Sequence, residues 1–431
     1  MKIIYTKDKE FKTEFENILK RAKSDIKGVS KIVENIIDEI VEDGNEALKR
    51  HIEKFDKWIV KSDDELLISQ DSMKKAYETL DESLKKSLHI AYERIKAYHE
   101  KQLPKSWIDF EENGTILGQK VTAVDRAGLY IPGGKAAYPS SLLMNAIPAI
   151  VAGVEEIVVC TPTPDNEVNE LLLAACHLCG IKKAYKVGGA SAIAAMAYGT
   201  QTIPKVDVIT GPGNIFVATA KKLVFGEVNI DMIAGPSEIG ILADETAKPH
   251  YLAIDLLSQA EHDEMASSIM ITTCDEIANK TSDEVEAYLK TLERETIART
   301  SIENRGVIIV AKDMTEAIAL MNEIAPEHLE IMTKNAFELL PYIKHAGAIF
   351  LGENTPEPIG DYLAAPNHTL PTGSTAKFYS PLNVENFMKK SSIINFSKNA
   401  INELGEACAL LADTEGLTAH AKAVRVRLEN K

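Results

Sequence analysis

From about Val121 onward, the sequence alternates between short runs of β-branched residues and longer alanine-rich amphipathic stretches. Examples from the first half are Glu156–Cys160 and Val206–Thr210, and examples from the second half are Ser268–Thr272 and Val307–Val310. Strands that alternate with helices in this way form βαβ units, which build parallel sheets covered by helices. We therefore predict an α/β protein with two parallel-sheet units.

The segments that flank this alternation have a different texture. Residues 10–102 are rich in Lys and Glu and carry apolar residues at helical spacing, as at Ile36, Ile37 and Ile40. After about Ser380 the chain returns to helical patterns. We therefore expect helical N-terminal and C-terminal extensions on either side of the two sheets.

The charge balance limits the partners of the chain. It has 48 basic and 64 acidic residues among 431, which gives a net charge of -16. Nucleic acids and anionic membranes are bound through clustered positive charge, so we expect neither as a partner. No apolar signal region opens the chain, and the longest apolar stretch, 142–154, contains Asn145 and Pro148. Secretion and membrane spanning are therefore not expected.

The five cysteines form no disulfide framework, because their number is odd. Reduced thiols are typical of a cytoplasmic protein, and the cytoplasm is the location we predict. Cys176 and Cys179 have a CxxC spacing but lie in an apolar run without a second such pair, so we interpret them as packed core thiols. Cys160, at the end of a predicted strand, is likewise interpreted as structural rather than as a nucleophile.

Four glycine-rich turns follow predicted strands, namely Gly128–Lys135, Gly188–Ser191, Gly211–Asn214 and Gly235–Ser237. Glycine lets the backbone approach a ligand, and the helix N-terminus that follows offers amide donors to a phosphate. None of the turns has the GxGxxG or Walker spacing, so nucleoside-triphosphate binding is not supported. A ligand-binding role and a purely structural role both remain open for these turns.

Two groups of polar residues are candidates for a metal site. Gln259 and His262 are three residues apart in a helical run, so an amide oxygen and an imidazole share one face. Asp361 and His368 lie in a Pro- and Gly-rich loop after the predicted strand 348–351, and α/β proteins bind ligands at the carboxyl ends of their strands. A single histidine on a helix is more often structural, so the hypothesis depends on both groups together.

A third candidate is the pair Glu327 and His328. Pro326 should end the preceding helix and place both residues in a turn. An acid beside an imidazole suits proton transfer, because histidine titrates near neutral pH and burial can raise the pKa of a glutamate. The alternative is a glutamate at a helix N-terminus beside a surface histidine.

Taken together, these segments closely resemble the histidinol dehydrogenase family, whose members depend on zinc and NAD. The resemblance covers about Val121 to Arg425 and is looser upstream. It is carried by Tyr130–Ser141, Gly211–Asn214, Ala234–Glu238, Ser258–His262, Pro326–Leu329, Gly360–His368 and Leu417–His420. It implies a four-electron oxidation, in which L-histidinol passes hydride to two NAD molecules in turn and becomes L-histidine through L-histidinal. This reaction is the last step of histidine biosynthesis.

The resemblance also implies roles for individual residues. His328 matches the general base, and Glu327 matches the residue that activates water for the aldehyde step. The implied ligands of one zinc ion per subunit, which orients the substrate, are Gln259, His262, Asp361 and His420. The implied substrate contacts are Ser237, Gln259, His262, His328, Asp361, Glu415 and His420, with Glu357 as a further acid in the pocket.

For the cofactor, Tyr130, Ser191 and Asn214 match NAD contacts of the family. Ser191 is a departure, because the family usually has a longer glutamine at this position. The resemblance further implies an intertwined homodimer, in which a C-terminal tail with Glu415 and His420 completes the partner's site.

The implied architecture is two Rossmann-like parallel-sheet units with helical extensions. The expected segments are an N-terminal helical segment at 1–25, a first α/β domain at 26–126 and 238–381 with most of the metal and catalytic site, an incomplete Rossmann-like NAD-binding domain at 127–237, and a helical tail at 382–431 that reaches the partner subunit.

Three alternatives stay open. The first is a paralogous zinc- and NAD-dependent dehydrogenase for another small alcohol, because a fold does not determine a substrate. The second is a zinc-dependent hydrolase, in which the metal activates water and Glu327 acts as base. The third is a non-catalytic binding protein in which the histidines are structural.

Overall fold

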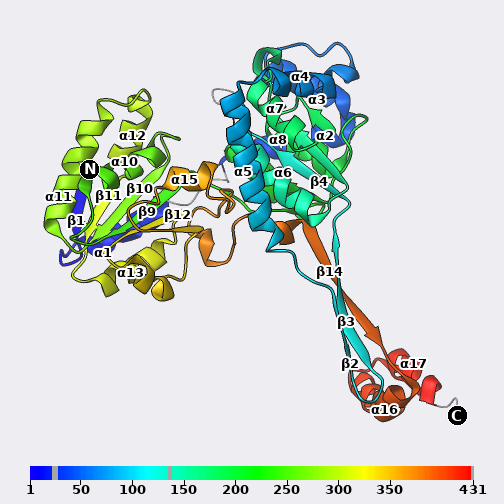
Figure 1. Ribbon diagram of the computed structural model, residues 1–431. Helices are drawn as coiled ribbons and strands as arrows, with labels where there is room; N and C mark the ends of the chain where they lie inside the picture. Colours follow the sequence, from blue (N-terminus) through cyan, green and yellow to red (C-terminus); the bar gives the residue numbers. More distant parts are fainter. Residues whose placement is uncertain (22–27, 134–137, 429–431) are drawn as a thin grey trace. The chain divides into compact units, whose positions relative to one another are not determined.

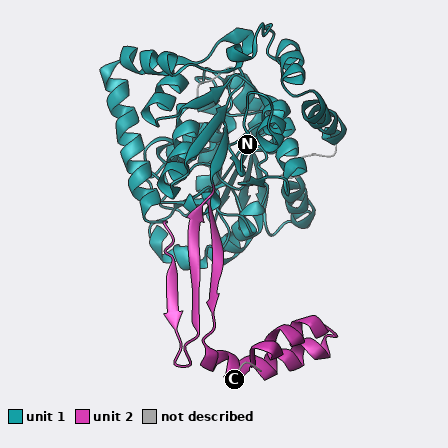
Figure 2. Ribbon diagram, turned by 90° about the vertical axis from the view of Figure 1, so that its right-hand side faces the viewer, with its two compact units in different colours: residues 1–102, 125–387 teal, residues 103–124, 388–431 magenta. Residues whose placement is uncertain are grey.

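The computed structural model describes residues 1–21, 28–133 and 138–428. Residues 134–137 of the glycine-rich motif that begins at Tyr130 lie outside the described residues. The chain divides into two units (Figure 2). The main unit comprises residues 1–102 and 125–387, and the tail unit comprises residues 103–124 and 388–431.

The main unit contains a six-stranded sheet with the order β1-β11-β10-β9-β12-β13, in which all neighbouring strands are parallel (Figure 1). Helices α10, α11 and α12 cover one face, and α1, α13 and α14 cover the other. The strands are β1 (Lys2–Tyr5), β9 (Glu238–Ala243), β10 (Ser267–Thr272), β11 (Val307–Val310), β12 (His328–Met332) and β13 (Ala348–Leu351). The helices are α1 (Phe11–Arg21), α10 (Pro249–Ala260), α11 (Asp275–Leu289), α12 (Glu295–Arg305), α13 (Met314–Ile324), α14 (Ala336–Leu339) and α15 (Glu357–Tyr362).

Alternating side chains of this sheet enter two separate cores. Ile239 and Ile241 pack toward α10, α11 and α12, whereas Leu242 and Ile271 pack toward α1 and α13. Burial on both faces explains the nearly continuous apolar runs seen in the sequence. The sheet also includes β1, so the segment 1–25, expected to be helical, begins with a strand.

The main unit also contains a five-stranded parallel sheet with the order β6-β5-β4-β7-β8. The chain first adds strands on one side of β4 and then on the other, which creates a topological switch point between β4 and β7. The strands are β4 (Arg126–Tyr130), β5 (Glu156–Cys160), β6 (Lys183–Tyr185), β7 (Val208–Thr210) and β8 (Asn229–Ile230). The helices are α6 (Pro139–Ala152), α7 (Glu170–Leu178), α8 (Gly189–Tyr198) and α9 (Ile215–Val224). The predicted α/β class with two parallel sheets is confirmed.

Four N-terminal helices pack against the helices of the five-stranded sheet. They are α2 (Ser30–Asp43), α3 (Asn45–Phe55), α4 (Gln70–Thr79) and α5 (Glu82–Glu100). Helix α2 contacts α8 and α9, α4 contacts α7, and α5 contacts α6. This differs from the expectation that 26–126 belongs with 238–381. The apolar face of α2, with Val33, Ile37 and Ile40, joins the core around Ile193, and an amphipathic pattern does not identify the partner of a buried face.

The tail unit is a three-stranded antiparallel sheet followed by two helices. Its elements are β2 (Trp107–Phe110), β3 (Ile116–Ala123), β14 (Met388–Asn395), α16 (Lys398–Thr414) and α17 (Thr418–Leu428). The segment 382–431, expected to be helical, therefore includes the strand β14 before its two helices. In the part of the chain that the structure describes, no helix combines the length and the apolar character that crossing a bilayer requires.

Candidate active site

Glu327 and His328 lie at the start of β12 and are both buried. Helix α13 ends at Ile324, and Ala325 turns the chain with a left-handed φ of 51°. Pro326 follows the end of the helix as the sequence predicts, but His328 begins a strand and does not lie in the expected turn. The alternative of an exposed histidine beside a helix N-terminus does not hold.

Hydrogen bonding defines the tautomer of His328. Its Nδ1 lies 3.1 Å from the carbonyl oxygen of Glu238, so Nδ1 donates and Nε2 keeps its lone pair. Nε2 lies 3.6 Å from Glu357 Oε1 and 3.9 Å from Asp361 Oδ1. Burial lowers the pKa of His328 to about 4. The imidazole is therefore a neutral proton acceptor at neutral pH.

Three carboxyl groups surround this imidazole and titrate differently. Burial raises the pKa of Glu327 well above its ordinary value, and burial together with nearby Asp361 raises the pKa of Glu357 to about 9. Burial opposes ionisation of Asp361 too, but the hydrogen bond from His368 and the nearby imidazoles lower its pKa to about 2. Ligand atoms of His328, Glu357 and Asp361 lie within 4.8 Å of one another, so this group can hold a cation.

The end of α10, which carries Gln259 and is followed by His262, lies beside this cluster, because the Ser258 hydroxyl is 3.4 Å from Glu357 Oε2. Gln259 is buried, and its Oε1 has no hydrogen-bond partner among the described residues. The helix ends at Ala260, so His262 lies in the following turn and is exposed, rather than on the helix face that its spacing suggests. Electrostatic interaction with His262 is among the lesser causes of the lowered pKa of both His328 and Asp361.

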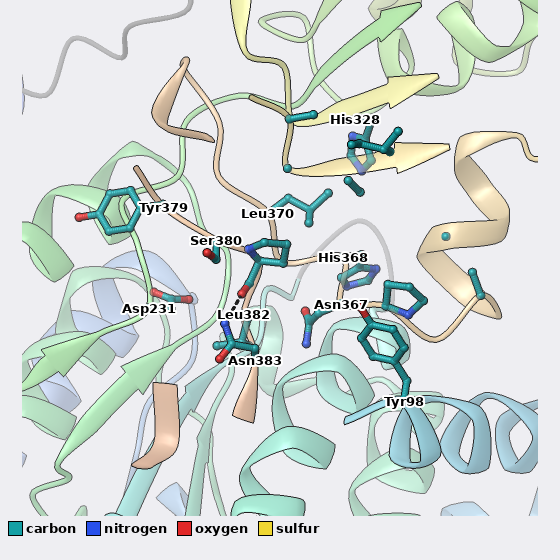
Figure 3. Close-up of a pocket in the computed structure, with 18 of the residues that line it drawn as sticks. Tyr98, Asp231, His328, Asn367, His368, Leu370, Tyr379, Ser380, Leu382 and Asn383 are labelled. Carbon is teal, nitrogen blue, oxygen red and sulfur yellow. Dashed lines mark hydrogen bonds between the residues drawn. The ribbon is translucent and has the colours of Figure 1, made fainter. Parts of the chain in front are cut away.

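A cavity of about 1170 Å³ opens beside these groups. Figure 3 shows His328, His368, Tyr98 from α5 and Asp231 around it. His328 and Ala348, which both line it, are the first residues of β12 and β13. The cavity therefore lies at the amino ends of these strands, not at the carboxyl ends where the sequence argument expected a ligand. The reason is that α15 and the loop after it return along the sheet from the carboxyl end of β13.

The three predicted cofactor residues lie at the carboxyl edge of the five-stranded sheet or on α8. Tyr130 ends β4, its hydroxyl accepts the Gly189 amide at 3.2 Å, and burial raises its pKa to about 12. Asn214 is exposed and caps α9, because its Oδ1 accepts the amides of the second and third helical residues. Ser191 is buried, and its hydroxyl lies 2.8 Å from His51 Nδ1.

The remaining predicted residues lie in different places. Ser237 is half-buried just before β9, and its carbonyl accepts the Ser267 amide at 2.9 Å. Glu415 and His420 are exposed residues of the tail unit, at the end of α16 and within α17. The structure thus clusters Glu327, His328, Glu357 and Asp361 within the main unit, while Glu415 and His420 belong to the other unit.

Sequence reasoning missed three buried acids beside this cluster. Glu238 begins β9 and its amide binds Glu327 Oε2 at 2.9 Å, and Glu330 Oε1 accepts the Glu357 amide at 2.7 Å. Asp255 on α10 hydrogen-bonds Glu330. Glu330 was detectable in principle, because residues two apart on a strand share a face and Glu330 follows His328 by two.

The cysteines are unpaired. Burial raises the pKa of the Cys160 thiol, and it raises that of Cys176 to about 12. Such thiols are poor nucleophiles and poor metal ligands, in agreement with the interpretation as packed core residues.

These features define a class of protein. The α/β main unit contains a buried, neutral imidazole, and the pKa values of the carboxyl groups around it are shifted in opposite directions. Such an arrangement is typical of an enzyme that moves protons.

Comparisons with known proteins identify the family. A family model described as histidinol dehydrogenase matches residues 19–428. A histidinol dehydrogenase of Sulfurimonas denitrificans is 71% identical, and one of Wolinella succinogenes is 68% identical, with 98% and 97% of each chain covered. The crystal structure of histidinol dehydrogenase from Elizabethkingia anophelis is 35% identical with a TM-score of 0.93, covering 100% of this chain and 98% of that chain. The chain belongs to the histidinol dehydrogenase family of oxidoreductases.

Proposed function

We propose that the chain catalyses the NAD-dependent oxidation of L-histidinol through L-histidinal to L-histidine, the last step of histidine biosynthesis. The observation that carries this proposal is the buried, neutral His328, which lies 3.7 Å from Glu327 and 3.6 Å from Glu357. The unpaired cysteines are in keeping with a reaction in the cytoplasm.

His328 is proposed to remove the proton in each oxidation. Nδ1 is engaged with Glu238, so only Nε2 is available to a substrate hydroxyl. The hydroxyl proton moves to Nε2 as hydride leaves the adjacent carbon. NAD, when bound, supplies the hydride acceptor. Because burial lowers the pKa of His328 to about 4, the imidazole loses the proton readily and can act again in the second oxidation.

Glu327 is proposed to activate the water that adds to the aldehyde. Its Oε2 is held by the Glu238 amide at 2.9 Å, so the carboxyl group has a fixed orientation. Burial raises the pKa of Glu327, which makes its carboxylate a stronger base than that of an exposed glutamate. Such a carboxylate can accept a proton from water and pass it on.

The residues at the site suit a zinc ion, with Gln259, His262, Asp361 and His420 as the proposed ligands. The buried Gln259 Oε1 lacks a hydrogen-bond partner among the described residues, and the Asp361 carboxyl is ionised because its pKa is lowered to about 2. Two imidazoles with two oxygen donors form a set that zinc accepts. Bound zinc would orient the substrate.

Substrate binding is proposed to involve the metal-site residues together with Ser237, His328 and Glu415. The proposed contacts are Ser237, Gln259, His262, His328, Asp361, Glu415 and His420. Carboxylates among them suit the ammonium group of histidinol.

We further propose that the protein forms a homodimer, in which Glu415 and His420 of one subunit reach the active site of the other. The tail unit supports this proposal, because it leaves large apolar side chains in solvent. Phe110 and Ile394 on its sheet are 72% and 70% exposed, and Leu410 and Leu411 on α16 are 62% and 69% exposed. Exposed apolar groups on this scale are typical of an interface.

NAD is proposed to bind near Tyr130, Ser191 and Asn214, at the edge where α8 and α9 begin. Gly211 is required there for a close turn, because its φ is 118° and a Cβ would lie 2.0 Å from the Tyr130 carbonyl oxygen. Ser191 should contribute least, since its hydroxyl is already engaged with His51.

The test is direct. Zinc-loaded protein is mixed with L-histidinol and NAD at alkaline pH, and NADH and products are followed. We expect two NADH and one L-histidine per histidinol, with loss on chelation and recovery on adding zinc. Absence of NADH would overturn the proposal, turnover of another alcohol alone would favour a paralogous dehydrogenase, and NAD-independent hydrolysis would favour a hydrolase.

A further inference from the structure

Helix α15 carries both Glu357 and Asp361 yet has only six residues. A helix this short is not stable by itself, so contacts from other elements must hold it. At its N-terminus, the Glu357 amide donates to Glu330 Oε1 at 2.7 Å, which ties the helix to β12. The position of Asp361, one turn later, depends on what holds the other end.

The C-terminal end of α15 is held by an arginine from α5. Arg94 Nε donates to the carbonyl oxygen of Leu363 at 2.5 Å, and Nη2 donates to that of Ala364 at 3.4 Å. The next residue, Ala365, has a left-handed φ of 96°, which costs free energy for a residue with a side chain. The guanidinium therefore binds the last carbonyls before a strained residue.

The segment that follows Ala365 is anchored by α6, a helix that contacts α5. Asn367 is buried and its Nδ2 donates to the Met144 carbonyl oxygen of α6 at 2.5 Å. Its neighbour His368 donates from Nδ1 to the Asp361 carbonyl oxygen at 3.1 Å. Helices α5 and α6, which contact each other, thus hold residues on both sides of Ala365.

We propose that Arg94 is a positioning residue of the metal site, which holds the end of α15 so that Asp361 stays beside His328. The proposal rests on the proposed function, since it takes Asp361 as a zinc ligand. Arg94 does not line the cavity beside His328. A planar guanidinium can bind two successive carbonyls with a fixed geometry, whereas a lysine offers a single flexible ammonium.

The test compares Arg94→Met, Arg94→Lys and Arg299→Met. Arg299 is a matched control, because it is a partly exposed arginine that pairs with Glu286 and Glu295 on the surface. Zinc affinity is measured by competition with a chelator, and amide hydrogen exchange is measured for residues 357–364. For Arg94→Met we expect about tenfold weaker zinc binding, faster exchange and activity restored by excess zinc. We expect partial recovery for Arg94→Lys and no change for Arg299→Met.

The proposal would be overturned if Arg94→Met had the zinc affinity and the amide exchange of wild type. It would also be overturned if Arg299→Met lost as much zinc affinity as Arg94→Met. If wild type neither binds zinc nor oxidises histidinol, the proposed function fails by itself. Exchange of residues 357–364 then decides the role of Arg94: faster exchange in Arg94→Met than in Arg299→Met supports it, and equal exchange overturns it.

Discussion

The two parallel sheets of the main unit place their polar groups at opposite edges. In the five-stranded sheet, the turns Gly188–Ser191 and Gly211–Asn214 follow the carboxyl ends of β6 and β7. In the six-stranded sheet, Glu238 and His328 are the first residues of β9 and β12, at the amino edge. The rule that parallel sheets bind ligands at their carboxyl ends predicts the first arrangement and not the second.

The difference has a physical basis. The carboxyl edge offers backbone amides of helix N-termini and close approach at glycine, which suits a phosphate-bearing cofactor. At the amino edge the helices end, and Gln259 lies next to the last residue of α10, where the helix dipole favours a cation. In the proposed function, one edge therefore recognises NAD through its backbone, and the other recognises zinc and the substrate through side chains.

The largest expected effect lies at the amino edge, in His328→Asn. Asparagine can still donate to the Glu238 carbonyl, but it has no basic nitrogen in place of Nε2. We expect kcat to fall about 1,000-fold, with the melting temperature and zinc affinity close to wild type. Steady-state kinetics with histidinol check this, with the exposed His89→Asn as control. A loss of less than tenfold would contradict the role of His328 as the base.

Sequence patterns predicted both sheets, because buried parallel strands and their helices leave strong periodic signals. They did not predict the packing partner of α2 to α5, since the pattern identifies a buried face and not what covers it. Glu327 and His328 were proposed as site residues from chemistry and resemblance, but their edge of the sheet was not predicted, because it depends on the path of α15. Glu238 was not singled out, because what distinguishes it from other glutamates is its burial, which the sequence does not reveal.

A smaller effect is expected at the carboxyl edge, in Gly211→Ala. The added Cβ would lie 2.0 Å from the Tyr130 carbonyl oxygen, at a φ of 118°. We expect about 3 kcal/mol of lost stability and a KM for NAD raised about tenfold, while zinc affinity stays unchanged. Gly226→Ala is the matched control, because Gly226 has a φ of 108° but nothing within 4 Å of its Cβ. Weaker zinc binding in Gly211→Ala would show that the two edges are not separate.

The next effect is a pH dependence of folding stability that comes from Glu238, at the amino edge of the six-stranded sheet. Burial raises the pKa of Glu238 to about 8, so the folded state holds this proton more tightly than the unfolded state. Stability due to this group is therefore full below about pH 4.3 and is lost as pH rises toward 8. Between pH 5 and pH 8 we expect zinc-free wild type to lose roughly 3 to 4 kcal/mol more than Glu238→Gln.

Denaturant unfolding at both pH values measures this difference. Glu303→Gln is the control, because the Glu303 side chain is 66% exposed and should leave the pH dependence as in wild type. Parallel curves for wild type and Glu238→Gln would mean that Glu238 ionises normally in the folded protein.

The smallest effect, and the finest test of the contrast between the edges, is expected for Ser191→Ala. The Ser191 hydroxyl lies 2.8 Å from His51 Nδ1, and His51 Nε2 lies 2.8 Å from Glu39, so the hydroxyl belongs to a side-chain network that links α8 to α3 and α2. Its loss should cost about 1 kcal/mol of stability and change the KM for NAD less than about threefold. Cofactor recognition would then depend mainly on backbone groups of the glycine turns. A tenfold rise in KM at unchanged stability would instead mean that the carboxyl edge, like the amino edge, recognises its ligand through a buried side chain.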